Sequence, residues 1–147
     1  MKKLLGLLLV IGFGLSFIGC SSDDDGPSEP PFSIVGTWKV TGKLINGVTQ
    51  DISGVCEYKG SVKFVSGGIF VEDVWGETTD HPCHLMETIG GTWEKNGDSY
   101  KVIVTTEGFE SILPETFTPE IESGNHSQFR ISATSLGTTT TLIFTKL

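Results

Sequence analysis

The feature that most constrains the fold of this chain is a two-residue alternation of apolar and polar side chains, which recurs from residue 34 to the C-terminus. In residues 34–44, IVGTWKVTGKL, one face carries Ile34, Gly36, Trp38, Val40, Gly42 and Leu44, and the other carries Thr37, Lys39, Thr41 and Lys43. Successive side chains of a β-strand point to opposite faces, whereas a helix repeats every 3.6 residues. No sustained helical period occurs, so we predict an all-β protein.

Short turn motifs separate the alternating segments. Asn46-Gly47 and Asn96-Gly97-Asp98 predict hairpin turns, because asparagine and glycine accept positive φ angles. Ser66-Gly67-Gly68 predicts a third turn. Pro114 and Pro119 bracket either an irregular region or an edge strand, since proline cannot donate to a sheet ladder. The pattern gives about eight strands joined by short connections.

Eight antiparallel strands in a chain of this length form either an up-and-down barrel or a two-sheet β-sandwich. The hairpins join neighbours and long crossovers are absent, which is typical of a meander. A meander that closes on itself has no exposed edges, and exposed edges invite aggregation. We therefore predict an eight-stranded antiparallel up-and-down β-barrel over residues 34–147, with a β-sandwich as the alternative.

The predicted inner face is rich in aromatic side chains. Residues 55–65 read as a strand that directs Cys56, Tyr58, Gly60, Val62 and Phe64 inward, and the C-terminal segments direct Phe129, Ile131, Ala133, Leu142 and Phe144 inward. Small barrels fill their interiors with side chains unless a cavity is left. Gly36, Gly42 and Gly60 would leave such room. The candidate ligand contacts are Trp38, Tyr58, Phe64, Phe70, Glu72, Trp93 and Tyr100.

Two acidic residues, Glu72 and Asp73, interrupt the apolar run IFVEDVW. One of them must face the interior or mark a bulge, because neighbouring residues of a strand point to opposite faces. If Glu72 lines a cavity, it contacts a polar group of a ligand or has a raised pKa.

The N-terminal segment predicts export. Lys2 and Lys3 precede an apolar run, Leu4–Ile18, which is shorter than the roughly 20 residues of a membrane span and typical of a signal-peptide core. The run ends in Phe17-Ile18-Gly19-Cys20, which resembles the bacterial lipobox. That resemblance implies a signal peptide over residues 1–19 and acylation of Cys20, with palmitate among the acyl groups. A free cysteine after ordinary cleavage and an uncleaved anchor are the alternatives.

Residues 20–33 predict a disordered, acidic and proline-rich tether. Several acyl chains on one cysteine anchor a protein stably, whereas one chain holds only marginally. We therefore expect a lipid-anchored protein of the outer membrane, either periplasmic or surface-exposed. The acidic residues after Cys20 resemble the export tag of surface-displayed lipoproteins, and a plain solvated spacer is the alternative.

The charge of the chain limits its partners. The net charge is −8, and loss of Lys2 and Lys3 brings it to about −10. Such an excess of acidic residues argues against nucleic acid as a partner. We expect a monomer whose partners are the lipid bilayer, through Cys20, and a small hydrophobic ligand.

Two cysteines remain after Cys20. In an oxidising compartment we expect Cys56 and Cys83 to form a disulfide. The rival interpretation is a metal site at HPCH, in which His81, Cys83 and His84 act with Cys56 or His126, but the spacing matches no recognised zinc pattern. No G-x-S-x-G motif occurs. We therefore expect no metal, no cofactor and no catalysis.

Three short motifs resemble those of bacterial lipocalin-like lipoproteins. They are Gly36-Thr37-Trp38 in the first strand, Gly91-Thr92-Trp93 followed by Asn96-Gly97 in mid-chain, and Leu142, Phe144 and Lys146 in the last strand. The resemblance implies an eight-stranded calyx that holds a small apolar molecule. It also implies an arginine packed on the tryptophan, Trp38. The candidates are Arg130, one strand before the last, and Lys146, which is a different residue type.

The expected function is therefore noncatalytic binding of a small apolar or amphipathic molecule at the cell envelope. The alternative is a surface interaction module, a filled barrel or sandwich that contacts another envelope protein or a glycan. A cavity lined by apolar side chains favours the first function. A solid interior with an exposed apolar patch favours the second.

Overall fold

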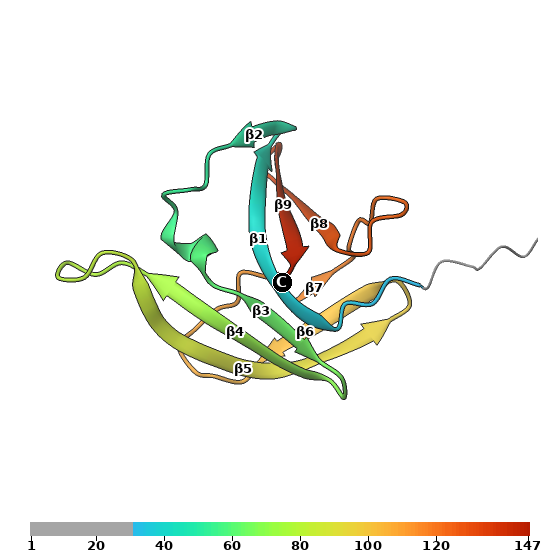
Figure 1. The fold of residues 1–147 in the computed structure, drawn as a ribbon, viewed down its shortest axis with the longest axis horizontal. Helices are drawn as coiled ribbons and strands as arrows, with labels where there is room; N and C mark the ends of the chain where they lie inside the picture. The colour runs from blue at the N-terminus through green and yellow to red at the C-terminus, as the bar shows by residue number, and fades with distance from the viewer. Residues whose placement is uncertain (1–30) are drawn as a thin grey trace, which may run out of the picture.

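The computed structural model describes residues 31–147 of the chain (Figure 1). The predictions for the signal peptide, for Cys20 and for the tether up to residue 30 lie outside the described residues and stay predictions. Phe32, at the predicted end of the tether, packs against the core, with its ring centroid 5.9 Å from that of Trp38 and 6.0 Å from that of Phe129.

The described chain consists of strands, short connections and one turn of 3₁₀ helix. The strands are β1 (Gly36–Ile45), β2 (Val48–Gln50), β3 (Val62–Val65), β4 (Ile69–Gly76), β5 (His84–Asn96), β6 (Ser99–Val104), β7 (Thr116–Phe117), β8 (Gln128–Ser135) and β9 (Thr138–Lys146). The 3₁₀ helix, η1, spans Cys56–Lys59. The prediction of an all-β protein is confirmed.

All strands belong to one antiparallel sheet that curls into a nearly closed barrel. Its strand order is β7-β6-β5-β4-β3-β1-β9-β8, with β2 paired to β1 off this path. The two ends of the sheet meet at a single bridge, in which the backbone N–H groups of Glu120 and Arg130 each donate to the other residue's carbonyl oxygen, at 2.8 and 2.9 Å. The eight-stranded up-and-down barrel is confirmed, and the sandwich alternative is not adopted.

The turns lie where the sequence predicts them. Asn46 and Gly47 have φ angles of 49° and 80° and join β1 to β2, and Gly97, with φ 62°, lies in the turn from β5 to β6. Between Pro114 and Pro119 the chain forms only the two-residue edge strand β7. These features are local, so the residues in the turns decide them.

A β-bulge at Thr41 interrupts the alternation of β1. Val40 pairs with Phe144 of β9, and Gly42 pairs with the adjacent residue of β9, Ile143. β1 therefore has one more residue than its partner at this point, and a bulge of this kind exchanges the two faces of the strand beyond it.

The exchange brings a lysine onto the inner face. Beyond the bulge Lys43 pairs with Leu142, and its Nζ donates a hydrogen bond of 3.0 Å to the hydroxyl of Tyr58. The prediction that Gly42 and Leu44 face inward is therefore wrong, as is the outward position predicted for Lys43. The alternation in the sequence continues through the bulge and gives no sign of it.

Two further predictions about inward faces need correction. Residues 55–61 do not extend the following strand but form η1 and its flanks, although Cys56 and Tyr58 are buried as expected. Ala133 is exposed rather than enclosed, because β8 has no strand partner on the side away from β9 beyond the bridge at Arg130.

Aromatic rings fill one end of the barrel. The side chains of Trp38, Phe64, Phe70, Phe129 and Phe144 are almost completely buried. Phe129 lies at the centre of this set: its ring centroid is 4.7 Å from that of Trp38 in an edge-on arrangement and 4.8 Å from that of Phe144 in a stacked one. We call this group the aromatic plug.

The glycines on the predicted inner face do not leave empty space. A Cβ at Gly36 would collide with the side chain of Lys146, and one at Gly60 would overlap the carbonyl oxygen of Asp73. Gly42 faces the side chain of Ile143 on the outside of the barrel. The prediction that these glycines create a cavity is wrong, since neighbouring atoms occupy the volume that they give up.

Candidate functional site

The barrel has an apolar opening where β6 and β8 do not pair, and we call it the side cleft. β7 pairs with β6 only at Tyr100 and Lys101, so the rest of β6 has no strand neighbour on this side. Inward-facing residues of β6, β8 and β9 form the wall of the cleft, and residues 105–115, which we call the strap, cover it. The cleft has a volume of about 760 Å³, and its apolar lining includes Val104, Phe109, Ile112, Ile131, Ala133 and Leu142.

The carboxylate of Glu72 holds the strap in place from inside the barrel. Glu72 is only 5% exposed. Its Oε1 accepts a hydrogen bond of 3.0 Å from the backbone N–H of Ile112, and its Oε2 accepts one from the hydroxyl of Ser111. The hydroxyl oxygen of Ser111 in turn accepts the N–H of Leu113 at 3.0 Å. The expectation that one acidic residue of β4 faces the interior is met by Glu72.

Burial raises the pKa of Glu72 above its ordinary value, and the hydrogen bonds from Ser111 and Ile112 offset only part of this effect. The ionised form loses hydration inside the barrel, and two donors do not replace it fully. Asp73, on the outer face of the same strand, adds a smaller contribution in the same direction.

We expect Glu72→Gln to remove a pH dependence of stability. The pKa of Glu72 is raised in the folded state above its ordinary value of 4.5. The protonated side chain therefore contributes to the free energy of unfolding, and this contribution is complete when the pH is below the ordinary value. It is lost as the pH rises through the folded pKa. Urea unfolding across this pH range should show the wild-type protein losing free energy of unfolding relative to the variant as the pH increases. The exposed Glu94→Gln is the control, and a difference that stays flat with pH contradicts the assignment.

The sequence-predicted contact residues belong mainly to the core. Trp38, Phe64, Phe70, Tyr100 and Tyr58 are buried, and half-buried Trp93 donates from Nε1 to the carbonyl oxygen of Val65 at 3.0 Å. None of these six residues lines the side cleft, and neither does Glu72, the seventh predicted contact residue. Their direct contact with a ligand stays a prediction.

The residues of the strap were missed by the sequence analysis. It gave Phe109, Ile112 and Leu113 no role, although three large apolar side chains within five residues are unusual for a solvated loop. That excess of apolar side chains is the signal that could have identified a segment packed over the barrel.

The tryptophan of the first strand has a basic partner, although this partner is a lysine and not the arginine that the family resemblance implied. Trp38 donates from Nε1 to the carbonyl oxygen of Ile34 at 2.6 Å, and the Nζ of Lys146 lies 5.3 Å from the centroid of its ring. Of the two candidates, Lys146 therefore takes this position. Arg130 instead approaches Glu122 on the surface, at 3.8 Å.

The predicted disulfide between Cys56 and Cys83 is confirmed, with a Cα–Cα distance of 5.3 Å. It joins η1 to the loop between β4 and β5, which projects beyond the barrel (Figure 1). The thiol of Cys83 in the HPCH segment, and that of Cys56, are thus not free to bind a metal. Within residues 31–147 no group of three or more His, Cys, Asp or Glu side chains is arranged to hold a metal ion.

The fold and the side cleft define a class: a small antiparallel barrel with an apolar opening into its interior. The family model for the lipocalin-like domain matches residues 34–143. The chain therefore belongs to the lipocalin-like domain family.

Two solved structures are similar to this chain. One is a lipocalin-like protein from Bacteroides uniformis, with 18% identity and a TM-score of 0.48 over 77% of this chain and 97% of that one. The other is an uncharacterized protein from Bacteroides eggerthii, with 14% identity and a TM-score of 0.47 over 78% of this chain and 100% of that one. The search of curated proteins finds no match.

Proposed function

We propose that this protein is a lipid-anchored binding protein of the cell envelope whose side cleft takes up a small apolar or amphipathic molecule, without catalysis. The observation that carries the proposal is the side cleft itself. Its volume of about 760 Å³ lies within the range of roughly 300–1,000 Å³ that is usual for small-molecule sites. Most of its lining residues are apolar, and Glu110, Ser111, Glu115 and Thr140 supply a few polar groups, as is usual for such sites.

The side cleft shares no lining residue with the aromatic plug. The aromatic plug closes the opposite end, so an apolar ligand would rest against Ile131 and Leu142 without passing through the barrel. Burying apolar surface of a ligand there is favourable by about 25 cal/mol per Å² before the costs of ordering are subtracted. A plugged barrel with a side opening is thus compatible with binding.

Anchoring at the membrane is supported by the sequence alone, through the apolar run Leu4–Ile18 and the lipobox-like end at Cys20. Within residues 31–147 no helix has the length and apolarity to cross a bilayer. In the proposed arrangement the acylated Cys20 holds the domain at the outer membrane through the acidic tether. The intact mass of the protein purified from membranes tests this, because acylated Cys20 adds the mass of its acyl chains.

We expect Ala133→Trp to block the side cleft. The full chain in phospholipid nanodiscs is irradiated with a diazirine-bearing fatty alcohol, and the labelled peptides are mapped by mass spectrometry. In the wild-type protein labelling should concentrate in residues 102–115 and 131–142, and Ala133→Trp should reduce it several-fold, because the indole occupies the space beside Ile131 and Leu142.

The matched control is Thr134→Trp, which places the same side chain on the next residue of β8, facing the outside, where Thr134 bonds to Thr139. This variant should label like the wild-type protein. Equal labelling of the two variants, or labelling scattered over the surface, would count against the side cleft as the binding site.

One observation favours the alternative of a surface interaction module. On the outer face of the sheet Ile69 of β4 pairs with Thr92 of β5 and is 53% exposed. Ile103 of β6, on the other side of Thr92, is 45% exposed and also borders the side cleft. Labelling that concentrates around Ile69, which does not line the side cleft, would favour this second function.

A further inference from the structure

A second cleft lies at the edge of β1 that faces β2 and β3. On this side β1 pairs with β3 only up to Trp38 and with β2 only from Lys43. The chain between β2 and β3 bows away from this unpaired stretch, and the disulfide at Cys56 ties it to the β4–β5 loop. The resulting cleft has a volume of about 800 Å³ and shares no lining residue with the side cleft.

Lysines gather around this second cleft, which we call the basic cleft. Lys39 and Lys59 line it. Lys43 lies behind its wall and donates to the hydroxyl of Tyr58, which is also a lining residue. This hydrogen bond raises the pKa of Lys43 above its ordinary value.

The two lining lysines form no ion pair with any residue of the described range 31–147. Among the residues that the structure describes, neither Lys39 nor Lys59 lies within ion-pair distance of a carboxylate, whereas Lys101 and Arg130 each approach a glutamate, at 3.7 and 3.8 Å. Ammonium groups that form no ion pair within the described chain can bind an external anion.

Two carboxylates also lie near the basic cleft. Asp51 lines it, and its Oδ1 accepts the backbone N–H of Ser53 at 2.9 Å. Glu57 lies next to Tyr58 on η1. Three lysines and two acidic residues thus lie in or beside this cleft. In the whole chain, by contrast, 18 acidic residues outnumber 10 basic ones. The local excess of positive charge runs against the charge of the whole protein.

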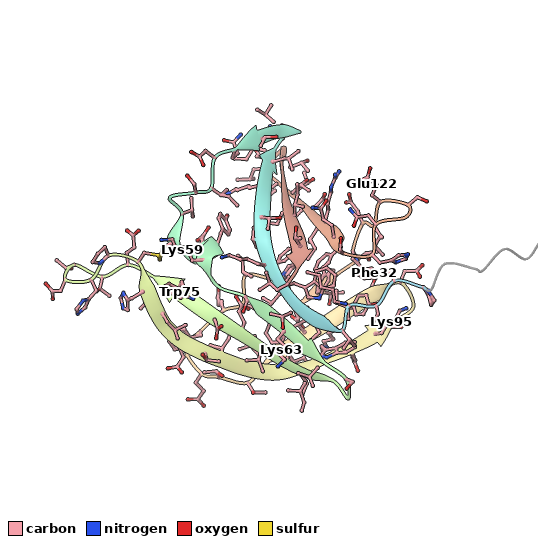
Figure 2. All side chains as sticks on the ribbon, viewed as in Figure 1. Phe32, Lys59, Lys63, Trp75, Lys95 and Glu122 are labelled. Atoms are coloured by element: carbon pink, nitrogen blue, oxygen red, sulfur yellow. A yellow bond between two sulfur atoms is a disulfide. The ribbon has the colours of Figure 1, made fainter. Side chains whose placement is uncertain are left out.

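A tryptophan with an unused donor completes the lining. Trp38 and Trp93 both donate their indole N–H groups to backbone carbonyl oxygens. Within the described chain Trp75, which lines the basic cleft and is half-buried, has no acceptor for its Nε1. Figure 2 shows Trp75 and Lys59 close to η1 and the base of the β4–β5 hairpin, while Lys95 lies at the opposite end of the molecule. An exposed indole offers a flat apolar face as well as a donor.

We infer that the basic cleft binds a small organic anion, a carboxylate or phosphate group carried on a ring. The ammonium groups of Lys39 and Lys59 bind the anionic group, and the ring packs on Trp75. Charged hydrogen bonds of this kind supply most of the affinity, and the planar side chain supplies the preference for a ring. This site is independent of the apolar ligand proposed for the side cleft.

The test is isothermal titration calorimetry of the full chain in nanodiscs of zwitterionic lipid, with 4-nitrophenyl phosphate as the probe and empty nanodiscs as the blank. We expect one saturable site. The double variant Lys39→Gln/Lys59→Gln should raise the Kd at least about tenfold, since each charged hydrogen bond that is lost weakens binding substantially. The matched control, Lys95→Gln/Lys101→Gln, makes the same change of charge at the other end of the barrel and should leave the Kd unchanged.

Comparison probes test the two parts of the inference separately. Neutral 4-nitrophenyl glucoside should not bind, and inorganic phosphate should bind more weakly than 4-nitrophenyl phosphate. Trp75→Leu should weaken binding of the ring-bearing probe and leave inorganic phosphate unaffected. Equal binding of the neutral probe, equal weakening by the control pair, or the absence of saturable binding overturns the inference.

Discussion

Trp38→Ala is expected to lower the free energy of unfolding by about 3–5 kcal/mol, the range typical of a large aromatic side chain removed from a core. Trp38 is fully buried, its ring packs edge-on against Phe129, and Lys146 lies over its face. The truncation leaves a cavity in the aromatic plug. It also leaves the carbonyl oxygen of Ile34 without the donor that it has at 2.6 Å.

Urea unfolding followed by far-UV circular dichroism measures this loss, and Trp38→Phe is the matched variant. Phenylalanine retains an aromatic ring but has no indole N–H, so Trp38→Phe should lower the free energy of unfolding by clearly less than Trp38→Ala. A domain of this size has a total stability of about 5–15 kcal/mol, and Trp38→Ala should therefore be close to the limit of folding at 37 °C. A loss below about 1 kcal/mol would show that the plug can close over the gap.

Removal of the disulfide by Cys56→Ala/Cys83→Ala is expected to cost about 3 kcal/mol, because the bond closes a loop between residues separated by 27 positions. Without the bond the unfolded chain gains conformations, while the folded barrel loses only the link between η1 and the β4–β5 loop. Amide hydrogen exchange should also accelerate most in residues 76–84, which lie at the end of the projecting hairpin.

The wild-type protein under reducing conditions is the control for this double variant and should reproduce its stability. If the variant and the reduced wild-type protein are both as stable as the oxidised protein, the disulfide does not constrain the unfolded state. A loss in the variant alone would show that the substitution at buried Cys56 disturbs packing.

The two candidate sites have a common structural origin. The side cleft lies where β6 and β8 are not paired. The basic cleft lies where the edge of β1 that faces β2 and β3 is unpaired between Trp38 and Lys43. At each place a connecting segment covers the gap, and a specific bond fixes that segment. Glu72 holds the strap, and the disulfide holds η1.

The amino-acid sequence by itself determined the strands, their turns and the barrel they form. Asn46-Gly47 and the turn at Gly97 adopt the positive φ angles that only a few residue types accept, so these hairpins depend on local chemistry. Alternation then places Trp38, Phe64 and Phe144 inside, since burial of apolar surface selects the face. The disulfide between Cys56 and Cys83 could be predicted because only two cysteines remain after Cys20 and the expected compartment is oxidising.

Only the tertiary structure decided the sites. The bulge at Thr41 depends on the register between β1 and β9, whose residues are about 100 positions apart in sequence, and it alone turns Lys43 inward. The strap is placed by a buried carboxylate, Glu72, 39 residues away from Ser111. Such contacts join segments whose local sequences carry no information about each other. The clefts therefore arise from the geometry of closing the sheet, which no single stretch of the chain specifies.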